Sequence, residues 1–193
     1  GRNLCDTDAS KIDGIKRDPD KDRTILYSLA RNNATLVKNK TLIADVKANY
    51  GDISESTFYS YIDVLKQLYV IEDLFGWAPN IRSKTAMRTG AKKVFIDPSI
   101  AVAALNLEPE AFNTKDGLET FGFIFENLCI RDLSIYASSL KGSLKYYHDD
   151  TGLEVDCVLK LKDGRYALIE FKLGRGKIDE GCKNLLKLNN LIE

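Results

Sequence analysis

Two tight-turn sequences in the second half of the chain divide an apolar stretch into three short strand patterns, and this arrangement restricts the fold more than any other feature. The turns are Asp149-Asp150-Thr151-Gly152 and Lys162-Asp163-Gly164. Asp-Gly between two apolar runs is a strong β-hairpin signal, because the turn needs positive backbone angles that these residues tolerate. The pattern predicts strands over residues 144–148, 154–161 and 166–172.

Apolar residues recur at helical spacing on both sides of these strands. The spacing predicts helices over residues 117–140 and 178–190, with Gly142 ending the first. Residues 111–193 therefore form one domain with the order helix, three strands, helix. The fold class that follows is α/β, of the α+β kind, with an α-β-β-β-α core.

The first half of the chain is dominated by helical patterns over residues 22–31, 41–50 and 54–65. Ser54 is a good N-cap for the third of them. A β-rich stretch follows from Leu68, and a second short strand is expected over 93–97. Helix, helix, turn, helix and strand is the order of a winged helix-turn-helix.

We assign residues 23–110 to this winged-helix-like module and the highly charged residues 1–22 to a linker. The third helix would be the recognition element, but the side chains it presents are neutral to acidic. A helical adaptor that packs against a neighbouring protein therefore stays open as an alternative to DNA recognition.

A basic stretch without any acidic residue, residues 80–93, lies between the β-rich stretch that starts at Leu68 and the short strand expected over 93–97. It contains Arg82, Lys84, Arg88, Lys92 and Lys93. Such a run can follow a DNA backbone as a wing, although a solvated basic loop is the usual explanation. Over the whole chain 28 Lys and Arg balance 28 Asp and Glu, so the overall charge gives no support to DNA binding.

Cysteine and histidine usage restricts the chemistry. The four cysteines are scattered without a CxxC pair, and His148 is the sole histidine, so the spacing offers no zinc site and disfavours a Ser-His-Asp mechanism. No apolar run approaches a membrane span and no signal peptide is visible, which predicts a cytoplasmic protein. The start without an initiator Met indicates part of a longer protein.

Charged side chains occupy two neighbouring predicted strands where apolar ones are the rule. The hairpin brings Asp156 close to Glu170 and Lys172, and Glu126 on the preceding helix can approach the same place. Asp156 and Glu170 are suited to hold Mg²⁺ or Mn²⁺, and Lys172 to contact a phosphate or orient water. This set predicts a phosphodiester hydrolase; a structural acid–lysine network is the alternative.

The spacing of these residues resembles the PD-(D/E)XK nuclease motif, in which an acid precedes a second acid and a lysine. Here thirteen residues separate Asp156 from Glu170-Phe171-Lys172. The resemblance implies a restriction-endonuclease-like core in which Asp156 and Glu170 bind metal, Lys172 is catalytic and Glu126 is a supporting acid. Val155 replaces the proline of the motif. The chain also stops at Glu193, before the strand that follows the second helix in that family.

A longer resemblance covers nearly the whole chain. Its segments are Arg82-Ser83-Lys84, Lys93 to Ser99, Gly122 to Leu128, Gly152 to Asp156 and Ile169 to Lys172. They look like a domain of unknown function that lies C-terminal to the ATPase in many prokaryotic AAA-type proteins. The implied partner is an ATPase domain of the same polypeptide. Gly174-Arg175-Gly176-Lys177 lacks the spacing and hydroxyl of a P-loop, so no nucleotide is expected to bind here.

The sequence thus leads to the expectation of an accessory region of an AAA-type ATPase that binds DNA and hydrolyses it with a divalent metal. The alternative is a non-catalytic DNA-binding, docking or homo-oligomerisation module with a degenerate nuclease fold.

Overall fold

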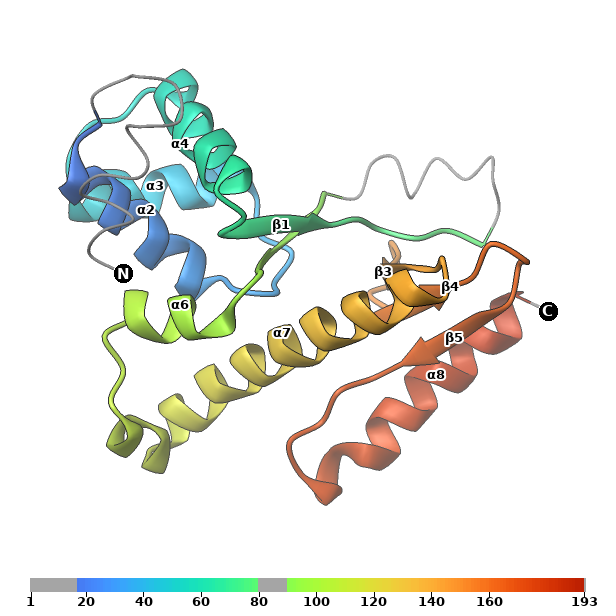
Figure 1. Ribbon diagram of the computed structural model, residues 1–193. Helices are drawn as coiled ribbons and strands as arrows, with labels where there is room; N and C mark the ends of the chain where they lie inside the picture. Colours follow the sequence, from blue (N-terminus) through green and yellow to red (C-terminus); the bar gives the residue numbers. More distant parts are fainter. Residues whose placement is uncertain (1–16, 80–89, 193) are drawn as a thin grey trace. The chain divides into compact units, whose positions relative to one another are not determined.

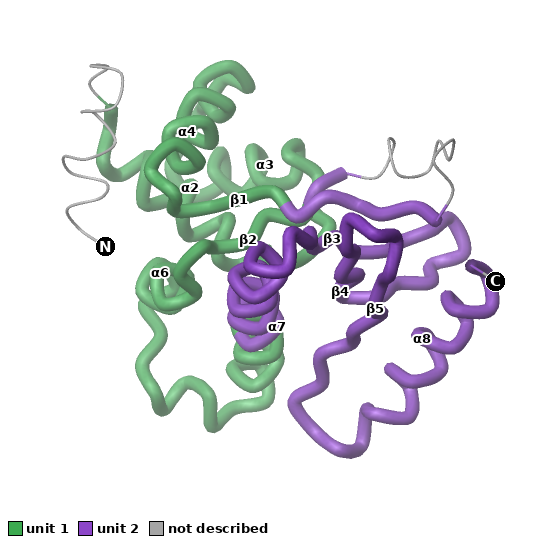
Figure 2. The backbone as a smooth tube through the Cα atoms, turned by 45° about the vertical axis from the view of Figure 1, so that its right-hand side comes forward, with its two compact units in different colours: residues 1–73, 92–124 green, residues 74–91, 125–193 purple. Residues whose placement is uncertain are grey.

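The computed structural model describes residues 17–79 and 90–192, which form two compact units. Residues 1–73 and 92–124 belong to the first unit, and residues 74–91 and 125–193 to the second (Figure 2). The division between the two units falls inside a long helix, α7 (Lys115–Ser139). The chain is a mixed α+β structure, as predicted.

Helices dominate the first unit (Figure 1). Its elements are α2 (Pro19–Arg31), α3 (Asn39–Asn49), α4 (Glu55–Gln67), β1 (Ile71–Leu74), β2 (Lys92–Phe95), α6 (Pro98–Ala104) and the 3₁₀ helix η2 (Pro109–Asn113). β1 and β2 pair as a two-stranded sheet. No helix within residues 17–79 and 90–192 is both long and apolar enough to cross a membrane.

Side-chain caps fix where these helices begin. The Ser54 hydroxyl accepts from the Thr57 amide at 3.1 Å, which confirms the predicted N-cap of α4. Asp18 caps α2 in the same way by accepting from the Asp20 amide at 2.9 Å, with Pro19 in the first helical position. α2 therefore begins within the charged stretch that the sequence assigned to a linker.

Residues 17 and 18 are also held by the third helix of this unit. Arg17 Nη2 donates to the Ser60 hydroxyl at 3.1 Å, and the Arg17 guanidinium lies 5.4 Å from the centre of the Tyr61 ring. The Asp18 amide donates to the Tyr61 hydroxyl at 3.1 Å, and the Tyr50 hydroxyl donates to the Asp18 carboxylate. The chain therefore joins the helical unit at an anchored point.

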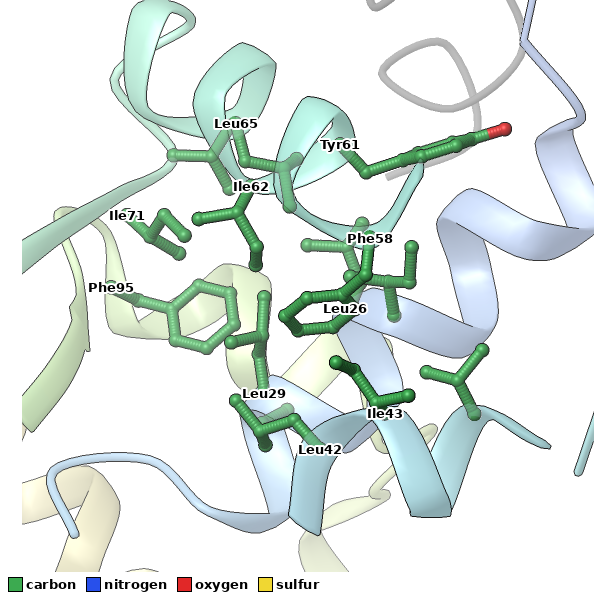
Figure 3. Packing of buried hydrophobic residues seen from close by; sticks show 14 of the residues in the cluster. Leu26, Leu29, Leu42, Ile43, Phe58, Tyr61, Ile62, Leu65, Ile71 and Phe95 are labelled. Atoms are coloured by element: carbon green, nitrogen blue, oxygen red, sulfur yellow. The ribbon is translucent and has the colours of Figure 1, made fainter. Parts of the chain in front are cut away.

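The core of the first unit is built from one face of each helix (Figure 3). Ile25 and Leu29 of α2, Leu42 of α3 and Phe58 of α4 are almost completely buried in it, as the helical spacing predicted. Phe95 of β2 closes the cluster. Burying such side chains contributes about 2 kcal/mol each, which makes this cluster the main stabilising feature of the unit.

A half-buried carboxylate ties the two strands to α4. Asp73 of β1 accepts from the Lys66 ammonium at 2.5 Å and from the Lys93 ammonium of β2 at 2.8 Å. Burial raises the pKa of Asp73, but the hydrogen bonds from the two lysines outweigh burial, so that the pKa lies below its ordinary value. The Lys93 side chain is only 10% exposed and therefore depends on Asp73 for its charge partner.

The second unit contains the predicted order of helix, three strands and helix. After α7 come β3 (Ser143–His148), β4 (Glu154–Lys160), β5 (Tyr166–Ile169), the short η3 (Arg175–Lys177) and α8 (Ile178–Ile192). β3 pairs with β4 and β4 with β5, both antiparallel. The Asp163-Gly164 hairpin is confirmed, with Gly164 at a φ of +93° that favours glycine.

Residues 75–77 extend this sheet beyond β3. Gly76 forms a parallel bridge with Tyr146, and the Trp77 amide donates to the Tyr146 carbonyl at 2.7 Å. The Trp77 ring packs against Tyr147, while Leu188 of α8 is buried under the strands. Tyr146 and Tyr147 are thus core residues of the strand.

We predict that Asp73→Ala lowers the free energy of unfolding by about 3 kcal/mol, because it leaves the Lys93 ammonium buried without its partner. Urea unfolding of the variant measures the loss. Asp52→Ala is the matched control, since it removes an ion pair with Lys47 whose side chains are 91% and 50% exposed. Solvent screens such a pair, so the control should change the free energy of unfolding little. Equal losses in the two variants would contradict the prediction.

Asp22 gives a second prediction. Its side chain is almost completely buried in the first turn of α2, and its Oδ2 has no hydrogen-bond partner among the described residues. Burial raises the pKa of Asp22 to about 7; the Arg17 and Arg23 charges oppose this shift and the Asp18 charge adds to it.

A raised carboxyl pKa means that the folded chain keeps a proton that the unfolded chain has already lost. This stabilisation is complete below the ordinary pKa of 3.8 and disappears as the pH rises through about 7. Between these values the free energy of unfolding should fall by about 1.4 kcal/mol per pH unit from this group. Asp22→Asn should remove that slope in urea titrations, whereas Asp20→Asn, an exposed change in the same helical turn, should keep it.

Candidate functional site

The backbone ladder between β4 and β5 ends at the pair Cys157 and Ile169, and side chains continue the pairing beyond it. The Phe171 amide donates to Asp156 Oδ2 at 2.9 Å, and the Asp156 amide donates to Glu170 Oε2 at 3.3 Å. Each carboxylate therefore binds the backbone of the opposite segment. The sequence expected a strand to residue 172, but β5 ends at Ile169 because these carboxylates replace the carbonyl acceptors.

Lys172 lies between the two acids. Its ammonium donates to Glu170 Oε1 at 2.7 Å and lies 4.0 Å from Asp156 Oδ2. The side chains of Glu170 and Asp156 are only 8% and 13% exposed, while that of Lys172 is 25% exposed. The structure thus brings together Asp156, Glu170 and Lys172 as the sequence pattern predicted.

Burial and charge act against each other in this cluster. Burial raises the pKa of Glu170, as does the neighbouring Asp156 charge, and the Lys172 ammonium opposes that rise without cancelling it. Burial lowers the pKa of Lys172, but the hydrogen bond to Glu170 and the surrounding negative charges outweigh it, so its pKa lies above the ordinary value. Lys172 is accordingly protonated at neutral pH.

Glu126 contributes to the same electrostatic environment. It lies half-buried on α7, and its charge is one of those that raise the pKa of Lys172. This influence is compatible with the role of a supporting acid, which remains a prediction for Glu126.

Gly181 is a feature of the site that the sequence did not indicate. It is buried in α8, and a Cβ atom built there would lie 3.0 Å from Glu170 Cγ and 3.5 Å from Lys172 Cε. Any side chain at this position would push against the cluster, so a glycine lets α8 pack directly behind it. In the sequence Gly181 is an isolated glycine in a helix, a signal that has no unique interpretation.

Asp156 and Glu170 have the chemistry to bind a divalent metal. Carboxylate oxygens are the ligands of Mg²⁺ and Mn²⁺, and the position of the Lys172 ammonium shows that a positive charge is accommodated between them. Within the described part of the chain, no group of three or more His, Cys, Asp or Glu is arranged to hold a metal ion. Water and substrate oxygens would have to complete the coordination, as is usual for Mg²⁺.

The structure places the basic stretch differently from the prediction. Arg82, Lys84 and Arg88 lie outside the described residues. Lys92 and Lys93 lie on β2 and are 2% and 8% exposed, and Lys93 is paired with Asp73. Because both are buried, they are not the solvent-facing wing residues that we expected to contact DNA.

Comparison with known families accounts for almost the whole chain. A family model described as a domain of unknown function, DUF8612, matches residues 2–111, which is more than half of the sequence. The chain belongs to the DUF8612 family. A second domain of unknown function, DUF4143, matches residues 121–193. No curated protein and no solved structure matches the chain.

The two predicted sites lie in different family segments. Asp156, Glu170, Lys172 and Glu126 all lie in the DUF4143 segment, which also contains β3 to β5 and α8. The basic stretch from Arg82 to Lys93 lies in the DUF8612 segment. The acid–lysine cluster is therefore a feature of the DUF4143 segment alone.

A substitution at Glu170 tests whether this cluster is coupled as described. Glu170→Gln removes the charge and the principal acceptor of Lys172, so we expect the pKa of the Lys172 ammonium to fall while burial continues to lower it. Nuclear magnetic resonance titration of ¹³C-dimethylated lysines, with Lys172→Arg for assignment, measures the change. Glu180→Gln, which alters an exposed acid of α8, should leave that pKa in place; an equal shift in both variants would contradict the coupling.

Proposed function

We propose that this chain is the C-terminal accessory region of an AAA-type ATPase and that its second unit is a nuclease-like domain that hydrolyses phosphodiesters with a divalent metal. The observation that carries the proposal is the convergence of Asp156, Glu170 and Lys172 where β4 and β5 separate. The helix, three-strand, helix order of that unit is compatible with a restriction-endonuclease-like core.

The first unit would serve this function as a winged-helix-like module. Three helices are followed by the paired strands β1 and β2, an order compatible with such a fold. The ion pairs of Asp73 hold the base of these strands against α4. The likeness of the whole chain to the region that follows the ATPase in prokaryotic AAA-type proteins supports the proposed ATPase partner.

Asp156 and Glu170 are the residues that would hold the metal, and a bound metal would supply charge neutralisation at phosphorus and a water of lowered pKa. Lys172 contributes a protonated ammonium that donates to a phosphate oxygen and stabilises the negative charge developing there. The backbone amide of Phe171 keeps the Asp156 carboxylate in position through its 2.9 Å bond. Gly181 lets α8 pack close to Glu170 and Lys172.

One observation favours a second candidate, a non-catalytic docking or oligomerisation module. The Lys172 charge is already matched by Glu170 at 2.7 Å, so that the pair can act as a structural brace without any ligand. The two candidates differ in metal binding and in cleavage.

DNA cleavage by the 193-residue chain with Mg²⁺ or Mn²⁺ is the test of the proposed function. Duplex, single-stranded and branched substrates should be included. Asp156→Asn and Lys172→Ala should each lower the cleavage rate by about a hundredfold or more, since each removes a group that acts on the transferring phosphate. Asp163→Asn, in the exposed turn at the other end of the β4–β5 hairpin, is the matched control and should retain the rate.

Calorimetric titration with Mn²⁺ separates the roles of the two groups. Asp156→Asn should lose metal binding, whereas Lys172→Ala should bind Mn²⁺ more tightly because the competing ammonium is gone. A wild-type chain that neither binds Mn²⁺ nor cleaves any of the substrates would favour the docking module instead.

A further inference from the structure

The loop between Lys172 and α8 carries two exposed cations next to the acid–lysine cluster. Arg175 and Lys177 lie in η3 and are exposed, together with the residues around them. Within the described part of the chain, neither forms a salt bridge, in contrast to Arg165, which pairs with Asp163 at 2.7 Å. Asp179 and Glu180 follow in the first turn of α8, a position that the helix N-terminus itself favours for acids.

The two glycines of this loop are not required by the fold. Gly174 has a φ of −145°, an extended conformation that any residue adopts. A Cβ atom added at Gly174 or Gly176 would meet nothing within 4 Å, and neither residue has the left-handed backbone that favours glycine. Glycine is also used where a backbone approaches a ligand closely, and the open space at both positions is compatible with that use.

Both ends of the loop adjoin the residues of the proposed reaction centre. It begins directly after Lys172, whose ammonium lies between the two acids. It ends at α8, whose Gly181 packs against Glu170 and Lys172. Arg175 and Lys177 follow Lys172 by three and five positions, so that the loop is the segment of the chain nearest in sequence to a phosphate bound at Lys172.

We propose that the loop Leu173–Lys177 binds the phosphate backbone of the nucleic-acid substrate, with Arg175 and Lys177 pairing with phosphates that flank the one at Lys172. The inference rests on the proposed phosphodiester substrate and gives that site its strand-binding element. Contacts of this kind position the substrate without selecting a base sequence. In this proposal the loop supplies the contacts to the DNA backbone that the buried Lys92 and Lys93 cannot make.

Equilibrium binding of a fluorescein-labelled DNA duplex to the 193-residue chain, measured by anisotropy in EDTA over a range of NaCl concentrations, tests the loop. The double variant Arg175→Ala/Lys177→Ala should bind more weakly, and the slope of log K against log salt should become shallower by about 2, one for each phosphate that is no longer neutralised. Lys162→Ala removes one exposed cation from the turn at the opposite end of the β4–β5 hairpin and should leave the slope unchanged.

The binding and cleavage experiments distinguish failure of the loop proposal from failure of the proposed function. If the double variant binds with the wild-type affinity and salt slope, or if the wild-type chain shows no salt-dependent binding, the loop proposal is overturned. If Asp156→Asn abolishes cleavage while the double variant still binds normally, the proposed function stands without the loop. If the wild-type chain does not cleave DNA but the salt slope of the double variant is shallower than that of the wild type, the loop is confirmed as a binding element and the catalytic proposal fails.

Discussion

The second unit depends on a reciprocal pair of hydrogen bonds at the point where two strands separate. Asp156 accepts from the backbone of residue 171, and Glu170 accepts from the backbone of residue 156. These bonds satisfy backbone amides that would otherwise be left without partners when the ladder ends. They also hold two carboxylates near enough that the Asp156 charge raises the pKa of Glu170, and the Lys172 ammonium offsets part of this repulsion. The ending of the sheet and the formation of the site are thus one event.

Local chemistry made much of the fold predictable. Ser54 caps its helix, Asp163-Gly164 forms its hairpin, and the apolar spacing of residues such as Ile25 and Phe58 identifies the buried helix faces, because each signal acts within a few residues. The convergence of Asp156, Glu170 and Lys172 was predictable for the same reason, since a single hairpin register sets it. The end of β5 at Ile169 was not, because side chains there replace the backbone acceptors.

Long-range partners explain the predictions that differ from the structure. From the sequence we predicted that Lys93 is one more cation of a basic loop. In the structure it is buried, because its ammonium pairs with Asp73, twenty positions earlier in the sequence. Asp22 reads as part of a charged linker, although the fold encloses it almost completely. In both cases the charge of a residue suggested exposure, and only the packing of distant elements reveals its environment. Gly181 belongs to the same class, because its meaning comes from Glu170 on another element.

The anchoring of residues 17 and 18 has a mechanical consequence. The Arg17 guanidinium is bound to Ser60 and lies over Tyr61, and the Asp18 backbone is bound to the hydroxyl of that same tyrosine. A pull on the chain ahead of residue 17 would therefore load the contacts to Ser60 and Tyr61 of α4 before it unwinds the first turn of α2.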